Sequence, residues 1–102
     1  MAELLEISNV YNTNKKLGPI EMLRAIKLAI ASEFEAIQIY QQIMESTEDK
    51  RIINVLKEIT NDEKHHVGGL YKLLGLLSPT DLKEYEIGYD ETLENFTDDE
   101  SE

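Results

Sequence analysis

The chain has 102 residues, with 21 acidic and 10 basic side chains and a formal net charge of −11, so it is one small domain. An acidic chain does not favour nucleic acid or an anionic membrane as a partner, because both attract Lys/Arg clusters. It has no cysteine, which excludes disulfides and thiolate ligands and leaves oxygen and imidazole as metal ligands.

The negative charge is concentrated near the C-terminus. Residues 1–80 hold 11 acidic and 9 basic side chains, whereas residues 81–102 hold 10 acidic side chains and only Lys83. No apolar run reaches the roughly 18 residues of a membrane span, and no secretory signal is visible. We therefore expect a cytoplasmic protein with a nearly neutral body and an acidic C-terminal segment.

The first predicted helix follows an N-terminal extension of residues 1–18. Pro19 suits a first helical turn, and the periodicity predicts a helix over about 19–46. Its apolar seam, interrupted by one carboxylate, consists of Ile26, Ile30, Glu33, Ile37, Tyr40 and Met44.

A second helix is predicted over about 49–76, after the capping run 46–49. The short connection makes the two helices antiparallel neighbours, each about 40 Å long. Gly68 and Gly69 are costly inside a helix, so a close approach of another helix is expected there.

Pro79 begins a third, shorter helix, for which we expect a break near Gly88. Its apolar positions are Leu82, Tyr85, Ile87, Tyr89, Leu93 and Phe96. The helical domain is predicted over 19–96, and residues 97–102 are expected to form an acidic tail or linker that is disordered in isolation. We predict an all-α fold, an antiparallel two-helix hairpin with a shorter C-terminal helix that dimerises into a four-helix bundle.

Glu63 and His66 form a Glu-x-x-His pair, and residues three apart share one side of a helix. The spacing alone is weak, but both lie in one apolar stripe, formed by Ile59, Glu63, His66, Leu70 and Leu73. Glu33 interrupts the first helix in the same way. A carboxylate at a helix seam is costly unless it is neutralised, so we predict that Glu33, Glu63 and His66 bind a metal.

One hairpin offers half of a di-iron ligand set, which needs four carboxylates and two imidazoles from four helices. A two-fold dimer would supply the other half, because the same patch meets itself at the axis. His65 points about 100° away from His66 and is left out of the ligand set.

The segments 33–40 and 62–66 resemble those of the encapsulated ferritins, a half-ferritin branch of the ferritin-like superfamily, over roughly residues 20–96. The resemblance implies that Glu33, Glu63 and His66 are ferroxidase ligands holding two irons across a dimer interface. It implies that Tyr40 lies beside the centre and that Glu35 matches a metal-entry position. It also implies an annular decamer built from dimers and housed inside an encapsulin shell that stores the oxidised iron.

The sequence departs from that pattern at Ser32, where some relatives are acidic, and it lacks an apolar C-terminal targeting peptide. The predicted function is oxidation of Fe(II) by dioxygen. The alternatives are an erythrin-like di-iron peroxidase, which in this chain would lack a rubredoxin-type iron site, and a non-catalytic helical scaffold. Oxygen versus peroxide as the oxidant stays open at this point.

Overall fold

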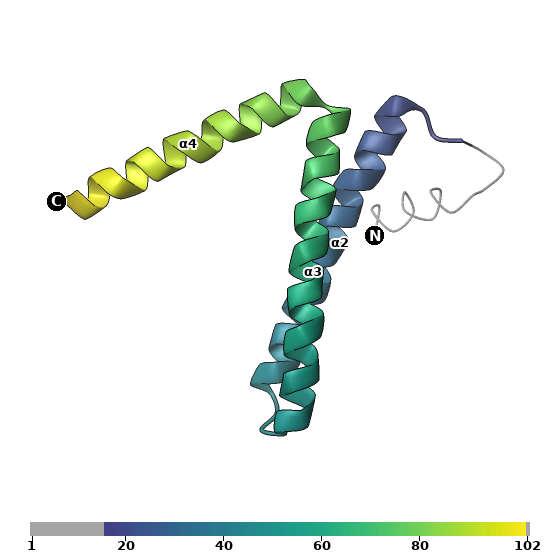
Figure 1. Ribbon diagram of the computed structural model, residues 1–102, viewed down its shortest axis with the longest axis vertical. Coiled ribbons are helices and arrows are strands. Elements are labelled where there is room, and N and C mark those ends of the chain that lie inside the picture. Colours follow the sequence, from purple (N-terminus) through teal and green to yellow (C-terminus); the bar gives the residue numbers. More distant parts are fainter. Residues whose placement is uncertain (1–15, 102) are drawn as a thin grey trace.

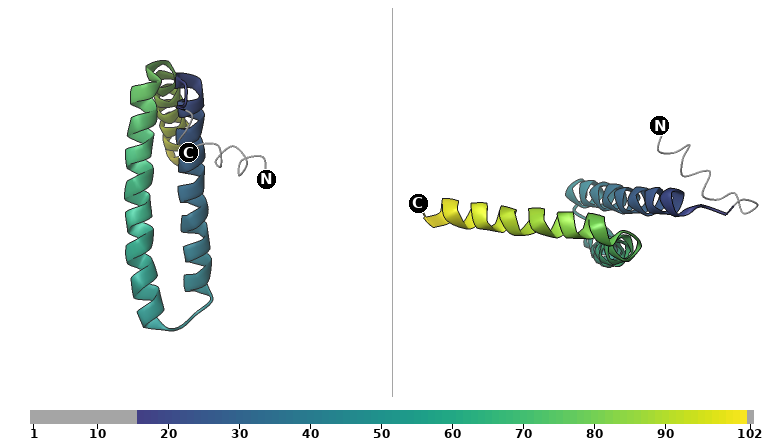
Figure 2. Two further views of the ribbon diagram at one scale, coloured as in Figure 1. Left: turned by 90° about the vertical axis from the view of Figure 1, so that its right-hand side faces the viewer. Right: turned by 90° about the horizontal axis from the view of Figure 1, so that it is seen from above.

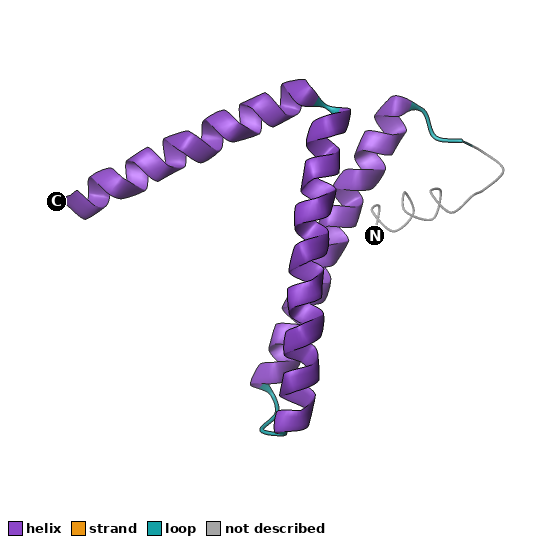
Figure 3. Cartoon of the chain, viewed as in Figure 1, coloured by secondary structure: helices purple, strands orange, loops and turns teal. Residues whose placement is uncertain are grey.

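The computed structural model describes the backbone of residues 16–101 and the side chains of residues 16–96. This part contains three helices and no strand: α2 (Pro19–Glu45), α3 (Lys50–Leu77) and α4 (Pro79–Ser101), drawn in Figures 1 and 3. The all-α prediction of a hairpin with a shorter C-terminal helix is confirmed. Most of the expected N-terminal extension, residues 1–15, lies outside the described residues. None of the described helices has the length and apolar character of a membrane span.

α2 begins where the sequence places a proline in the first turn. Gly18 is the N-cap, and its carbonyl oxygen accepts from the amide of Met22 at 2.9 Å. At the other end, the amide of Ser46 donates to the Ile43 carbonyl at 3.0 Å, and the Ser46 hydroxyl donates to the Gln42 carbonyl at 2.7 Å. These two bonds satisfy carbonyls of the last turn, so the chain can leave the helix there.

α3 begins with a side-chain cap. Asp49 Oδ1 accepts from the backbone amide of Arg51 at 3.0 Å, and the Arg51 guanidinium donates to both Asp49 oxygens at 3.1 and 2.8 Å. Thr47 Oγ1 accepts from the amide of Asp49 at 3.1 Å. The connection between α2 and α3 is therefore a hydrogen-bonded turn, which fixes the heights at which side chains of the two helices meet.

α2 and α3 run antiparallel along their whole length (Figure 2), but they enclose little. Among the described apolar side chains only Ile37 and Leu74 are buried, at 8% and 5% exposure. Many large apolar side chains stay exposed in the single chain, including Phe34, Ile39, Ile43, Ile52, Val55, Leu73 and Leu77. A pair of helices has too little interior to cover two apolar faces, so one chain alone lacks a complete core.

α4 leaves the end of α3 at a sharp elbow and projects away from the hairpin (Figure 1). Ser78 and Pro79 form the corner, where the Ser78 amide donates to the Leu74 carbonyl at 2.9 Å. Gly75 is buried against Leu82 of α4, and a Cβ at Gly75 would lie 2.8 Å from the Leu82 Cδ2. Together with a 3.8 Å ion pair between Lys27 and Asp81, this contact sets the direction of α4.

The close approach expected at Gly68 and Gly69 is wrong for the single chain, because nothing lies within 4 Å of a Cβ at either position. The close approach is at Gly75 instead. The break expected near Gly88 is also absent, since a glycine keeps its amide and costs only about 1 kcal/mol in a helix. The helix α4 continues to Ser101, past residue 96 where the helical domain was predicted to end. No proline or glycine follows Gly88 to stop the helix. The domain boundaries themselves stay predictions.

The Asp49 cap gives a pH-dependent prediction. The Arg51 side chain, and then its backbone amide, lower the pKa of Asp49 below 3.8. A group whose pKa is lowered on folding stabilises the fold above its unfolded pKa and loses that effect as pH falls through the folded value. We expect Asp49→Ala to lower the melting temperature by a few degrees at pH 7 and to have a smaller effect below the folded pKa of Asp49.

Asp49→Asn is the matched control, because asparagine also caps a helix but cannot form the ion pair. Its melting temperature should lie between those of the wild type and Asp49→Ala at pH 7, measured by circular dichroism. A difference between wild type and Asp49→Ala that stays the same from pH 7 to pH 2 would contradict this account.

Candidate metal centre

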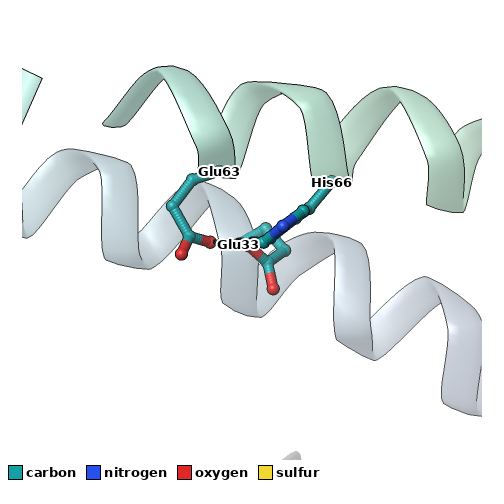
Figure 4. Close-up of side chains that lie close together, drawn as sticks. All are labelled: Glu33, Glu63 and His66. Atoms are coloured by element: carbon teal, nitrogen blue, oxygen red, sulfur yellow. Dashed lines mark ion pairs between the residues drawn. The ribbon is translucent and has the colours of Figure 1, made fainter. Parts of the chain in front are cut away.

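Glu33, Glu63 and His66 lie together between the middle of α2 and the middle of α3. Figure 4 shows the three side chains pointing toward one another from the two neighbouring helices. One ligand atom from each lies within 4.8 Å of the others, and in the described part of the chain they form the group that could hold a metal ion. The antiparallel pairing makes this possible, because Glu33 and Glu63 are each near a helix midpoint.

The donor atoms of the group are too far apart for hydrogen bonds and only slightly farther apart than ligands of one bound ion. His66 Nδ1 lies 3.6 Å from Glu33 Oε2 and 3.7 Å from Glu63 Oε2. An N–H···O hydrogen bond normally spans about 2.7 to 3.2 Å. Two donor atoms that each lie about 2.1 Å from one ion are separated by about 3 to 3.5 Å. The three side chains therefore leave a gap close to the size that one cation fills.

Glu33 provides an independent sign that something belongs in this gap. Its Oε2 atom is buried and has no hydrogen-bond partner. A buried carboxylate oxygen without a partner is costly, and it is normally paired or coordinated to a metal. The side chains of Glu33 and Glu63 are only 25% and 19% exposed, so water gives them little compensation. The residues present thus fit a divalent cation.

The site is open on one side. The His66 side chain is 58% exposed, and the stripe on α3 that carries it is not buried within one chain, contrary to the expected core position. Exposed apolar side chains continue this stripe in both directions, namely Ile52, Val55, Leu73 and Leu77. A half-open ligand set in the middle of an exposed apolar face is the arrangement expected of a site that lies at an interface between chains.

The other residues singled out from the sequence lie outside this group. His65 is exposed, as its 100° offset from His66 predicts. Glu35 is exposed on α2, and Tyr40 is half-buried seven residues after Glu33. The structure also brings together a feature that sequence reasoning missed, an aromatic pocket at the α3–α4 elbow. Tyr85 and Tyr89 were visible as apolar positions of the predicted third helix, whereas Tyr71 was not singled out. The elbow angle that gathers them was not predictable.

Comparison with known families gives a match between residues 23–101 and the model of the rubrerythrin family. A solved structure, the encapsulated ferritin domain from Pyrococcus furiosus, superposes with a TM-score of 0.76 and 31% identity, covering 84% of this chain and 88% of that one. The three-helix arrangement is therefore a ferritin-like helical fold.

Two longer proteins are similar in sequence. A ferritin-like–encapsulin shell fusion protein from Pyrococcus furiosus is 32% identical over 83 residues, which are 81% of this chain and 24% of that protein. An encapsulin nanocompartment cargo protein from Myxococcus xanthus is 26% identical over 65 residues, 64% of this chain and 50% of that protein. The chain thus spans a quarter to a half of the length of these relatives.

The metal-binding prediction can be tested without any measurement of activity. Anaerobic Fe(II), or redox-inert Zn(II), should raise the melting temperature, because a ligand in hundredfold excess over its Kd stabilises a fold by about 2.7 kcal/mol. Glu33→Gln should abolish this rise in melting temperature, since it removes the negative charge of the buried carboxylate. Glu35→Gln, a change of the same kind at an exposed position two residues away, should retain it. Equal shifts in the two variants would place the metal elsewhere.

Proposed function

The chain belongs to the rubrerythrin family, whose members are typically di-iron proteins with oxidoreductase activity, and from this premise we propose that it is a ferroxidase. Its substrates are Fe(II) and dioxygen. The observation that carries the proposal is the convergence of Glu33, Glu63 and His66 in the middle of an exposed apolar face. Two irons bind for each pair of chains.

The count of ligands requires a second chain. One chain supplies two carboxylates and one imidazole, enough to hold one ion, whereas the ferritin-like di-iron ligand set has four carboxylates and two imidazoles. Two-fold pairing through the face that carries His66 doubles each ligand and brings the copies together at the axis. The same pairing covers Val55 and Leu73, which are 56% and 39% exposed in the single chain.

The face of α2 beside Glu33 is suited to this pairing. Ala29 and Ala36, four residues before and three residues after Glu33, lie on its side of the helix, so a second helix can approach closely. Ile43, 42% exposed, continues the same side toward the end of α2. Small side chains around the ligands and larger ones beyond them leave room for the ions while sealing the ends of the interface.

The chemistry that these residues support is electron transfer from two Fe(II) to dioxygen. Each iron gives up one electron, so dioxygen takes two electrons from one pair of irons and two protons from the solvent to become hydrogen peroxide. With two further electrons from a second pair of irons and two further protons from the solvent, it is reduced to water. Four carboxylates favour the product, because a hard, anionic oxygen site binds Fe(III) more tightly than Fe(II). The imidazole of His66, on the open side, fixes the position of the substrate without adding charge.

The relatives bear on where the reaction takes place. One is named as a fusion with an encapsulin shell and the other as the cargo of an encapsulin nanocompartment. In our proposal this chain is likewise cytoplasmic and enclosed by an encapsulin shell protein, as pairs of chains assembled into an annular decamer. A thin helical assembly has no large cavity of its own, so the oxidised iron is stored in the surrounding compartment.

A peroxidase is the second candidate, because the matching family is the rubrerythrin family. It would use the same ligands with hydrogen peroxide as the electron acceptor. The ratio of iron to oxidant separates the two. A ferroxidase consumes one dioxygen for two or four Fe(II), whereas a peroxidase oxidises two Fe(II) for each hydrogen peroxide and is slow with dioxygen. A non-catalytic scaffold would oxidise no iron beyond the uncatalysed rate.

The decisive variant for the reaction is Glu63→Ala. Removing this carboxylate from each chain should lower the initial rate of aerobic Fe(II) oxidation by about 100-fold or more. Glu58→Ala, five residues earlier on the exposed face of α3, should keep the wild-type rate. The rate is read from the absorbance of Fe(III), with oxygen uptake measured in parallel. Equal rates in the two variants would reject the ferroxidase proposal.

The pairing has its own test in Leu73→Glu, which leaves all three ligands in place. A charge in the apolar face should hold the protein as single chains and slow the oxidation of Fe(II) together with assembly. Ile87→Glu on α4 is the control, with a comparable exposure of 43% against 39%. Mass is measured by light scattering beside the oxidation rate. A monomeric Leu73→Glu that oxidises iron at the full rate would show that one chain suffices.

A further inference from the structure

Thr60 is a buried polar residue in the middle of α3, outside the three candidate ligands. It is 4% exposed, and its Oγ1 atom has no hydrogen-bond partner. Among the side chains that the structure describes, one other buried oxygen shares this property, and it is Oε2 of Glu33. A buried polar atom without a partner is uncommon and needs a physical explanation. For Glu33 the explanation is the candidate metal centre, and the same explanation fits Thr60.

The hydroxyl of Thr60 differs from other helical hydroxyls of this chain. A threonine in a helix commonly donates to the carbonyl oxygen three or four residues earlier. Thr92 does so in α4, where its Oγ1 donates to the Gly88 carbonyl at 2.9 Å, and Ser46 donates to the Gln42 carbonyl at 2.7 Å. Thr60 does not form this local bond, although burial leaves it little access to water. Its hydroxyl therefore remains free to donate to another group.

Thr60 lies in the seam along which α3 packs on α2. A row of buried and half-buried side chains follows α3 at spacings of three and four residues, which is the spacing of one helix face. The row includes Leu56, Thr60, Glu63, Val67, Leu70 and Leu74. Thr60 thus comes one turn before Glu63 in the same seam. His66 is exposed beside this row, so Glu63 is the candidate ligand of α3 that shares the seam with Thr60.

The direction of helical side chains favours Glu63 over Glu33 as the acceptor. A long side chain on a helix points back toward the N-terminus of that helix and covers the preceding turn. Glu63 therefore points toward the turn that contains Thr60. Glu33 points toward the N-terminus of α2, and because α2 and α3 are antiparallel, this direction leads toward His66, 3.6 Å from Glu33 Oε2 to His66 Nδ1, and away from Thr60.

The Glu63 carboxylate has room for both a metal and a hydroxyl. Its Oε2 atom lies 3.7 Å from His66 Nδ1, on the side where the three candidate ligands meet (Figure 4). An ionised carboxylate has about four lone-pair sites on its two oxygens, so it can bind a cation and accept a hydrogen bond at the same time. A hydrogen bond from a hydroxyl to a charged carboxylate is also stronger than one to a neutral group.

We propose that Thr60 is a positioning residue of the candidate metal centre, and that its hydroxyl donates to the Glu63 carboxylate when a metal is bound. Threonine has two allowed χ1 rotamers in a helix, so rotation about χ1 can bring the hydroxyl to the carboxylate. The bond fixes the orientation of the Glu63 carboxylate, as hydrogen bonds to metal-binding carboxylates generally do. The inference rests on the proposed function only for Glu33, Glu63 and His66 as metal ligands.

Thr60→Val removes the hydroxyl and keeps the branched shape, so it tests the proposal on the full chain. The metal-free variant should melt at or above the wild-type temperature, because an unpartnered buried hydroxyl is lost. Its Kd for Zn(II), measured by isothermal titration calorimetry, should nevertheless rise by about 10-fold to 100-fold. Thr60→Ser keeps the hydroxyl and should bind Zn(II) nearly as tightly as the wild type. Thr92→Val, the same change at an exposed position, should have the wild-type Kd.

Glu63→Ala separates this inference from the proposed function. If Glu63→Ala binds Zn(II) like the wild type, the metal centre itself is wrong, and the role of Thr60 fails with it. If Glu63→Ala binds weakly and Thr60→Val binds like the wild type, only the role of Thr60 is overturned. Equal weakening in Thr60→Val and Thr60→Ser would overturn it too, because the hydroxyl would then not be the cause.

The assigned acceptor has a test of its own in the double variant. Thr60→Val should not weaken Zn(II) binding further in a chain that already carries Glu63→Ala, because the carboxylate through which the hydroxyl acts is gone. The same loss of affinity in both backgrounds would show that Thr60 acts on another group and would overturn the proposed bond to Glu63.

Discussion

A single chain of this fold has very little interior, and this limits how much of its apolar surface it can bury. Two helices side by side can bury only the narrow line along which they touch, and among the described apolar side chains only Ile37 and Leu74 are buried there. Much of the remaining apolar surface is exposed, where it is costly in water and available to other chains. In our proposal the fold is therefore a component of an assembly, and its functional surfaces are faces that a larger single-chain bundle would have buried.

The proposed iron ligands depend on this constraint. In a complete four-helix bundle the ligands are enclosed by one polypeptide, whereas here Glu33 and Glu63 lie half-buried at the edge of the seam and His66 lies outside it. The buried Glu33 oxygen has no hydrogen-bond partner, which is a cost of placing a carboxylate at this position in a single chain. Pairing and metal binding thus favour each other, since each removes a cost that the other would meet alone.

Local chemistry made most of the hairpin predictable. Pro19, the Asp49 cap and the periodic apolar positions predicted the helices of the hairpin to within two residues. The Glu-x-x-His spacing in phase with Ile59 and Leu70 singled out two of the three candidate ligands that the structure brings together. The prediction that failed concerns a contact between residues on different helices. The site of close packing is Gly75 and not Gly68 or Gly69, because it depends on where Leu82 returns after the elbow. No local signal in the sequence specifies that angle.

The elbow also keeps α4 apart from the hairpin. If α4 folded back along the hairpin, its apolar side chains would cover apolar side chains of α2 and α3. The acidic helix would then lie beside the candidate ligand carboxylates and repel them. The contact of Gly75 with Leu82 and the ion pair of Lys27 with Asp81 hold it away instead. A small fold that cannot bury its surfaces by itself then separates them, with the candidate metal ligands in the middle of the hairpin and the aromatic pocket at the α3–α4 elbow.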